Sequence, residues 1–265
     1  MSSVVSSVVN SVVNSVVNLK SRIAAGEALL GTFLKTPHPH IVEVLATSGL
    51  DCICIDAEHA PFDRRDIDVC VMAAQLGRLP VLVRTQSSCA EQILNALDCG
   101  ADGVLVPHVR TTAEAHAVAA AAHYRVGGRG YAGSSRAAGY GTVAMPDHKA
   151  ASAARTVVIA QIEDAEALDE IDAIAAVEGI DALFVGRIDL TVSLGCESPD
   201  DPKVIAAVER IVAACVAANR PVGMFVSRTS DVVMWREKGA TLFLLGSDHG
   251  FVREGAKALR VAAGL

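Results

Sequence analysis

Polar side chains that follow apolar segments are the residues of this chain that could do chemistry. The run Val157–Glu163 begins with four apolar, mostly β-branched residues, which is typical of a strand buried on both faces, and it ends in Gln161, Ile162 and Glu163. Side chains alternate across a strand, so Gln161 and Glu163 should point to the same side. We expect the strand to present both groups there; the alternative is a strand that simply frays into a polar loop.

Two carboxylates are candidates for a metal site. Glu163 ends one predicted strand, and Asp189 follows the next one, Ala182–Val185, through the sequence Gly-Arg-Ile-Asp. Carboxylate oxygens are hard ligands that suit Mg²⁺ or Mn²⁺, and two of them leave coordination positions open for water and substrate. Zinc is less expected, because no His or Cys cluster accompanies them. Alternatively, both acids pair with Arg84 or cap helices.

A histidine and an arginine follow two other apolar segments. His59 comes directly after Asp56 and Glu58 and is a natural general base near neutral pH, although a lone histidine is often only structural. Arg84 follows Val81–Val83, and a buried arginine is costly unless it meets a carboxylate or an anionic substrate. We assign no role to His108, which follows another apolar segment.

The elements that must position these groups alternate regularly along the chain. From Leu29 onward, a short apolar strand is followed by a helical stretch eight times. The predicted strands are Leu29–Phe33, Cys52–Asp56, Val81–Arg84, Gly103–Pro107, Val157–Glu163, Ala182–Val185, Val222–Val226 and Thr241–Leu245. This rhythm predicts a single-domain (β/α)8 TIM barrel, in which the carboxyl ends of the strands carry the functional groups.

Local signals agree with this alternation. Ser88–Glu91 and Thr111–Glu114 have the pattern of capping boxes, and Asp201 before Pro202 has the pattern of a helix start. A doubly wound open sheet is the alternative fold, but its dinucleotide fingerprint is missing from the first strand–helix turn. One G-x-G-x-x-G does occur at 128–133; it follows a predicted helix, so we expect a loop there.

Composition excludes several classes of protein. The 265 residues are 51% hydrophobic with a net charge of −7 and no basic run, so neither nucleic acid nor a membrane is expected as a partner. The seven cysteines form no C-x-x-C pair and lie mostly in apolar segments, which predicts reduced core thiols and a cytoplasmic protein. Residues 1–18 repeat Val-Val pairs among Ser and Asn; we expect either an apolar helical stripe or a tail there, ahead of the barrel domain at 19–265.

Several of these motifs together carry a resemblance to a known family. They are Ile55–Pro61 (IDAEHAP), Val83–Arg84, Leu97–Ala101 (LDCGA), Gln161–Glu163 and Gly186–Leu190 (GRIDL). In order and spacing they resemble the HpcH/HpaI aldolases, which are metal-dependent pyruvate aldolases, over residues 19–265. The resemblance implies reversible aldol cleavage of a 4-hydroxy-2-oxo acid into pyruvate, or a close analogue such as hydroxypyruvate, and an aldehyde.

The resemblance also implies roles for particular residues. A divalent metal, Mg²⁺, Mn²⁺ or Co²⁺, would be held by Glu163 and Asp189 and chelated by pyruvate, with Gln161 close by. Arg84 would hold the keto oxygen and the developing enolate. The acid/base would be His59, oriented by Asp56 or Asp98. Backbone N–H groups near Ile188 and Asp189 would receive the pyruvate carboxylate.

One departure from the family concerns Arg187, which stands where proline is common and could either alter aldehyde selection or point to solvent. The resemblance further implies a homo-oligomer, typically a hexamer with helices exchanged between neighbours. Two alternatives stay open. An acyl-CoA carbon–carbon lyase of the citrate-lyase-like branch should have a basic patch for the CoA phosphates. A non-catalytic barrel that serves as a binding protein should have lost part of the constellation.

Overall fold

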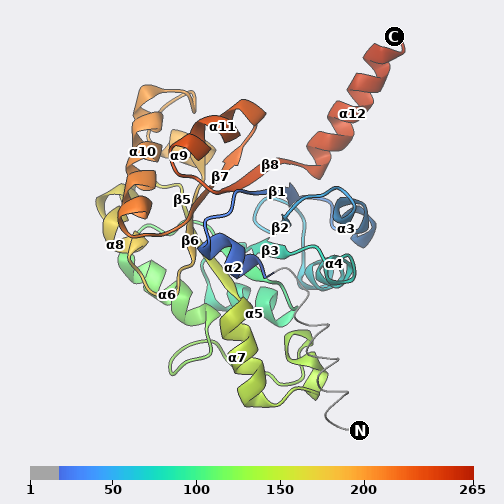
Figure 1. The fold of residues 1–265 in the computed structure, drawn as a ribbon, viewed down its shortest axis with the longest axis vertical. Coiled ribbons are helices and arrows are strands. Elements are labelled where there is room, and N and C mark those ends of the chain that lie inside the picture. Colours follow the sequence, from blue (N-terminus) through green and yellow to red (C-terminus); the bar gives the residue numbers. More distant parts are fainter. Residues whose placement is uncertain (1–17) are drawn as a thin grey trace.

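Eight parallel strands form a closed barrel in the computed structural model, which describes residues 18–265 (Figure 1). The strands are β1 Leu29–Leu34, β2 Cys52–Asp56, β3 Val81–Arg84, β4 Gly103–Val106, β5 Val157–Ile162, β6 Ala182–Val185, β7 Val222–Val226 and β8 Leu242–Ser247. Each strand pairs with its neighbours in sequence, and β8 pairs with β1 to close the ring. The predicted TIM barrel is confirmed. The predicted bounds of β2, β3, β6 and β7 match the observed ones, and those of the other four strands differ by one or two residues.

Helices follow each strand, and those between the strands lie around the outside of the barrel. They are α2 Leu19–Ala24, α3 Pro39–Ala46, α4 Arg64–Leu76, α5 Ala90–Asp98, α6 Thr112–Ala122, α7 Met145–Arg155, α8 Ile171–Ala175, α9 Arg187–Ser193, α10 Pro202–Ala217, α11 Thr229–Glu237 and α12 Asp248–Ala262, with the 3-10 turns η1 Arg136–Gly141 and η2 Ala165–Asp169. No helix among residues 18–265 is long and apolar enough to cross a membrane.

Helix starts follow the expected chemistry with one exception. Thr111 and Glu114 form a reciprocal capping box on α6, and the Asp201 side chain accepts a hydrogen bond at the start of α10. The prediction for Ser88–Glu91 is wrong: the N-cap of α5 is Cys89, one residue later, and its side chain makes no capping hydrogen bond. Residues 128–133, the G-x-G-x-x-G sequence, lie in a loop as predicted.

The barrel has an inner and an outer apolar layer. Inside the ring, side chains from alternating strand positions pack together, among them Phe33, Leu82, Ile159 and Phe184. The other face of each strand packs against the helices. Cys52, Cys54, Cys70, Cys99 and Cys215 are buried and free, which confirms the core role predicted for most cysteines.

The two ends of the described chain are placed very differently. Leu19 and Ile23 of α2 are buried in the inner layer, so α2 closes the amino end of the barrel. The predicted Val-Val stripe at 1–18 lies outside the described residues, apart from Asn18. At the other end, α12 projects away from the barrel instead of packing against it (Figure 1), and Val252 and Leu259 on it are exposed.

Candidate active site

A pocket of about 240 Å³ opens at the carboxyl ends of the strands. It is lined by Phe33, His59, Arg84, Gln161, Phe184, Gly186, Arg187, Ile188, Asp189 and Phe225. Three phenylalanines supply apolar walls, and the polar groups come from the ends of β2, β3, β5 and β6. The pocket therefore gathers five residues for which the sequence predicted a role: His59, Arg84, Gln161, Ile188 and Asp189.

Arg84 is buried where β3 ends and is held by β2. Its Nη2 and Nε atoms lie 2.8 and 3.1 Å from the same oxygen of Asp56, and its Nε lies 3.3 Å from Glu58. The guanidinium also stacks 4.5 Å from the ring centre of Phe33. Burial disfavours the charged form, but Asp56 outweighs it, so the pKa of Arg84 is raised. Its Nη1 hydrogen-bonds to no other described residue, so this N–H group can donate to a ligand in the pocket.

Asp56 is completely buried beneath the pocket. Burial alone would raise its pKa, but Arg84, the His59 backbone N–H and Lys35 together hold the pKa of this carboxyl below its usual range. The His59 N–H donates to Asp56 at 3.1 Å, and Lys35 Nζ lies 3.0 Å from its other oxygen. Asp56 therefore orients both Arg84 and the turn that carries His59.

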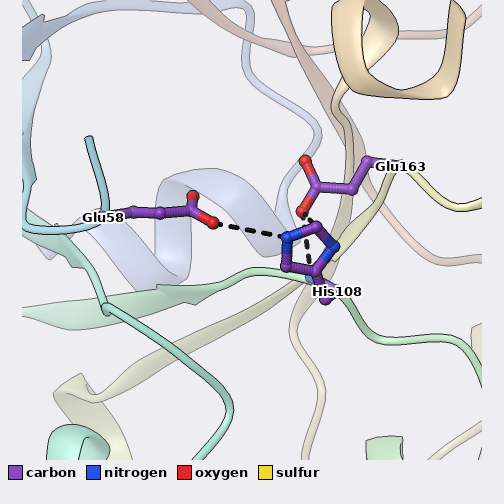
Figure 2. Close-up of side chains that lie close together, drawn as sticks. All are labelled: Glu58, His108 and Glu163. Carbon is purple, nitrogen blue, oxygen red and sulfur yellow. Dashed lines mark hydrogen bonds and ion pairs between the residues drawn. The ribbon is translucent and has the colours of Figure 1, made fainter. Parts of the chain in front are cut away.

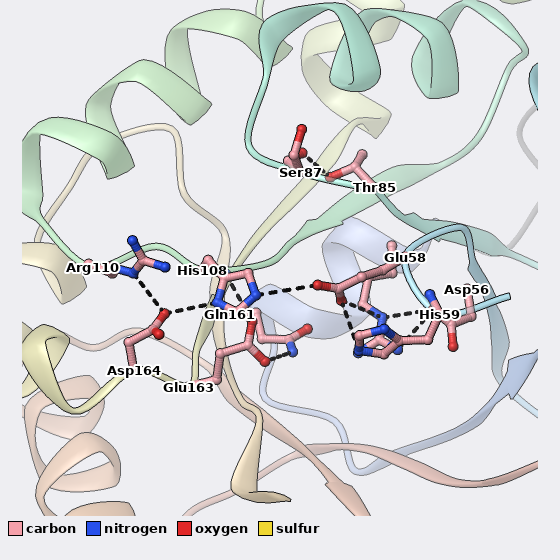
Figure 3. Close-up of polar contacts among 11 residues, drawn as sticks. Asp56, Glu58, His59, Thr85, Ser87, His108, Arg110, Gln161, Glu163 and Asp164 are labelled. Atoms are coloured by element: carbon pink, nitrogen blue, oxygen red, sulfur yellow. Dashed lines mark hydrogen bonds and ion pairs between the residues drawn. The ribbon is translucent and has the colours of Figure 1, made fainter. Parts of the chain in front are cut away.

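His59 is half exposed at the rim, with Nε2 3.7 Å from Glu58 (Figure 3). This distance is longer than a hydrogen bond, so the imidazole is free to meet a substrate or a water molecule. Asp98, the other residue predicted to orient His59, is the last residue of α5. It is paired there with Arg129, so within this chain it does not contact His59.

Gln161 and Glu163 point to the same side of β5, as alternation predicts. Gln161 Nε2 donates to one oxygen of Glu163, and the His108 backbone N–H donates to the other at 2.9 Å. Gly186 makes this packing possible, because a Cβ at that position would lie 2.5 Å from Glu163 Oε2 and 3.0 Å from Gln161 Nε2. Burial raises the pKa of Glu163, against the opposing effect of the hydrogen bonds from Gln161 and the His108 backbone.

Glu58 and His108 join Glu163 in a cluster that the sequence reading missed (Figure 2). One donor atom from each of the three residues lies within 4.8 Å of the other two. Burial also raises the pKa of Glu58. Burial tends to lower the pKa of His108, but the neighbouring carboxylates, Asp164 first, raise it. The available signal was the strand order: Pro107 and His108 directly follow β4, which pairs with β5 in the barrel.

The segment that carries Asp189 is fixed by Arg187. The Arg187 side chain is 6% exposed, pairs with Asp200 at 2.6 Å and Asp231 at 3.3 Å, and donates to the Pro199 carbonyl. It therefore ties the start of α9 to the following loop and to α11. The alternative that the Arg187 side chain points to solvent is therefore wrong. Asp189 itself is exposed at the pocket wall.

The donor set of this site fits a divalent cation. Its candidate ligands are carboxylates, an amide oxygen and one imidazole. Two buried oxygens, Gln161 Oε1 and Glu58 Oε2, have no hydrogen-bond partner among the described residues. Buried polar atoms are rarely left unpaired, so oxygens of this kind point to a bound ion or ligand.

Comparison with known proteins agrees with this geometry. The sequence pattern of the HpcH/HpaI aldolase/citrate lyase family matches residues 29–254. A 5-keto-4-deoxy-D-glucarate aldolase from Escherichia fergusonii is 35% identical over 242 residues, which cover 91% of this chain and 94% of the relative.

Solved structures have the same fold. A HpcH/HpaI aldolase/citrate lyase family protein from Burkholderia cenocepacia superposes with a TM-score of 0.87 at 34% identity, covering 93% of this chain and all of the other. The citrate synthase SbnG superposes with a TM-score of 0.84 at 28% identity, covering 93% and 97% of the two chains.

Proposed function

Since the chain belongs to the HpcH/HpaI aldolase/citrate lyase family and is a metal-dependent aldolase, a carbon–carbon lyase, we propose that it cleaves 4-hydroxy-2-oxo acids reversibly to pyruvate, or an analogue such as hydroxypyruvate, and an aldehyde. The observation that carries this proposal is the convergence of Arg84, His59, Gln161 and Asp189 on one small pocket. The negative charge of a developing enolate is stabilised by a cationic hydrogen-bond donor, here Arg84, beside the oxygen ligands of a metal site. The aldolases among the relatives favour this function over a non-catalytic barrel.

The metal would be held by Glu163 and Asp189, with Gln161 close by. Mg²⁺, Mn²⁺ and Co²⁺ are the candidates, given the oxygen-rich donor set. When bound, such an ion acts as a Lewis acid on the keto oxygen of the substrate. Its expected place next to Gln161 is supported by the unpaired Oε1 atom of that side chain.

The remaining groups have distinct tasks. In the cleavage direction, His59 takes the proton of the C4 hydroxyl, directly or through water, and the C3–C4 bond breaks to release the aldehyde. The electron pair stays on the pyruvate fragment as an enolate, whose oxygen accepts a hydrogen bond from Arg84. Transfer of that proton from His59 to C3, directly or through water, then gives the pyruvate methyl group. Backbone N–H groups near Ile188 and Asp189 would orient the carboxylate.

The size of the pocket favours a small acid over an acyl-CoA. About 240 Å³ suits a ligand of a few carbon atoms. The neighbouring cations Arg187 and Arg228 are both paired with Asp200 and Asp231, so they offer little net charge to the CoA phosphates. As a first substrate we propose 5-keto-4-deoxy-D-glucarate, because the relative from Escherichia fergusonii is named as the aldolase of that compound.

We further infer a homo-oligomer, with a hexamer expected from the family resemblance. The exposed apolar side chains of α12 include Phe251, Val252 and Leu259, and in a single copy of the chain this helix leaves the barrel. A second copy of the chain is the partner best matched to such an arm. The buried, free cysteines are consistent with a reducing compartment such as the cytoplasm.

Removal of the metal tests the proposed function. Purified protein stripped with a chelator should lose cleavage of 5-keto-4-deoxy-D-glucarate, measured as pyruvate release, and Mg²⁺, Mn²⁺ or Co²⁺ should restore it. Full activity of metal-free protein, or a lysine adduct trapped by borohydride, would contradict the proposal. If this substrate is not cleaved even with metal present, the assay is repeated in the synthetic direction, with pyruvate and a panel of aldehydes, to find the aldehyde that the protein accepts.

A further inference from the structure

His108 stands at the carboxylate cluster in a conformation that the surrounding structure imposes. Its φ of 56° places it in the left-handed region, which is strained for a residue with a Cβ. The conformation is fixed by the hydrogen bond that its backbone N–H donates to Glu163. The ring thereby lies between Glu58 and Glu163, as Figure 2 shows. The proposed function gives this ring no task.

The two ring nitrogens have different partners. Nδ1 lies 3.0 Å from Asp164, within hydrogen-bond distance, and 3.4 Å from Glu163. Asp164 is itself paired with Arg110 at 3.1 Å (Figure 3). Nε2 lies 3.5 Å from Glu58, which is too far for a good hydrogen bond. If Nδ1 carries the proton that Asp164 accepts, Nε2 keeps a free lone pair. Metal-bound histidines usually have this arrangement, with a carboxylate behind the ring.

The spacing of the cluster fits ligands of one ion. Two ligands bound at about 2.1 Å lie about 3 Å apart at a right angle and about 4 Å apart across the ion. The donor atoms of Glu58, His108 and Glu163 lie within 4.8 Å of one another, so small side-chain movements suffice. The Glu58 side chain is only 9% exposed, and its Oε1 is the oxygen that faces His108 Nε2. Its Oε2 lies against Arg84 and has no hydrogen-bond partner among residues 18–265.

We propose that His108 Nε2 is a protein ligand of the divalent ion, positioned by Asp164 and bound together with Glu58 and Glu163. This inference rests on the metal of the proposed function and adds a nitrogen to its oxygen ligands. Imidazole binds Co²⁺ and Zn²⁺ much better than Mg²⁺. The site therefore selects transition metals over Mg²⁺, and the sequence-based expectation that zinc is disfavoured no longer holds for this cluster.

Metal titration of the full-length apo-protein tests the selectivity. In His108→Ala, affinity for Co²⁺ should fall by at least about 10-fold, while affinity for Mg²⁺ changes much less. Asp164→Asn should weaken Co²⁺ binding by about 10-fold through the ring orientation. His116→Ala, an exposed histidine on α6, is the matched control and should bind as the native protein does. Equal Co²⁺ affinity in His108→Ala and native protein would overturn the proposal.

Pulsed EPR of bound Mn²⁺ tests the ligand itself, without any activity assay. The native protein should show nitrogen modulation of the electron spin echo, and this signal should persist in His116→Ala and vanish in His108→Ala. Bound Mn²⁺ without the modulation, or modulation that survives in His108→Ala, overturns the proposal. Glu163→Gln distinguishes failure of the His108 proposal from failure of the proposed metal site. If Mn²⁺ affinity is unchanged in that variant, the ion is bound elsewhere and the proposed metal site also fails.

Discussion

The guanidinium of Arg84 divides its hydrogen bonds between the protein and the pocket. Nε and Nη2 are taken by Asp56, while Nη1 bonds to no other residue in the described range. The hydrogen bonds from Nε and Nη2 to Asp56 fix the plane of the guanidinium, so the remaining N–H groups have a defined direction. A lysine could supply the charge at this position, but it could not supply that direction.

Arg84 should act on the enolate and contribute little to binding of the substrate in its ground state. We expect exchange of the pyruvate methyl protons in D₂O, followed by NMR, to fall by about 10²-fold or more in both Arg84→Ala and Arg84→Lys, with metal still bound. This exchange requires no aldehyde and therefore isolates enolisation. Exchange that survives in either variant while cleavage is lost would assign Arg84 to the aldehyde half of the reaction.

His59 should be needed for proton transfer but not for assembly of the site. Its imidazole is half exposed and makes no short hydrogen bond to another described residue. His59→Ala should therefore lower kcat for cleavage by about 10²–10⁴ while metal affinity and melting temperature stay near native. The exposed His116→Ala variant is the control for loss of a histidine. Near-native turnover of His59→Ala would mean that another group moves the proton.

Asp56 should make stability depend on pH in the acid range. Its pKa in the folded protein is lowered, so the ionised carboxylate stabilises the fold at pH values above the unfolded pKa of about 3.9, and this contribution is lost as the pH falls through the folded pKa. Urea unfolding between pH 7 and pH 3 measures the effect. Asp56→Asn should be less stable by about 3–5 kcal/mol at pH 7, since Arg84 loses its buried partner.

The same titration separates Asp56 from the other acids. In Asp56→Asn, the loss of stability below about pH 4 should be smaller than in the native protein, because the titrating group is gone. Parallel curves for the two proteins would assign the acid sensitivity to other carboxylates.

At the scale of elements, the site depends on how closely the turn after β6 approaches the end of β5. Gly186 allows that approach because it has no side chain. Gly186→Ala should cost about 1–3 kcal/mol of stability from overpacking and should weaken metal binding, since Glu163 must move. Gly130→Ala is a fair control, because a Cβ there meets nothing within 4 Å. Native metal affinity in Gly186→Ala, measured by calorimetry, would argue against this dependence.

The strands could be predicted from the sequence because each is a short apolar run bounded by turn residues. The placement of Arg84, Gln161 and Asp189 followed from the rule that functional groups stand at the carboxyl ends. Helix starts were less certain: Ser88 has the right neighbours for a cap, but the backbone places Cys89 at that position. Local sequence patterns do not determine which of two adjacent residues ends a loop.

His108 and Arg187 show what sequence patterns alone could not give. The position of His108 depends on a positive φ and on a hydrogen bond to a residue 55 positions away. The burial of Arg187 depends on Asp200 and Asp231, which come from a loop and another helix. Both arrangements depend on tertiary contacts between elements, and one sequence without an alignment does not show which elements meet.

At the scale of the whole molecule, α12 is the element that the barrel leaves uncovered. We expect light scattering of the full chain to give a mass several times that of one copy. Leu259→Glu, which places a charge on the apolar side of α12, should reduce that mass. Lys257→Glu places the same charge among the polar residues of the helix and should leave assembly much closer to native. A native mass for Leu259→Glu would place the subunit interface elsewhere.

The buried ion pairs of Arg187 also have a consequence for anyone who wants to change the range of aldehydes that the enzyme accepts. The pocket wall beside Asp189 contains two kinds of side chain. The Ile188 side chain is half exposed, so it can be randomised in a library with little risk to folding, whereas Phe225 packs against Phe33 and should be varied only among apolar residues. Arg187 lines the same cavity but joins three segments of the chain, so it should be left unchanged while its neighbours are varied.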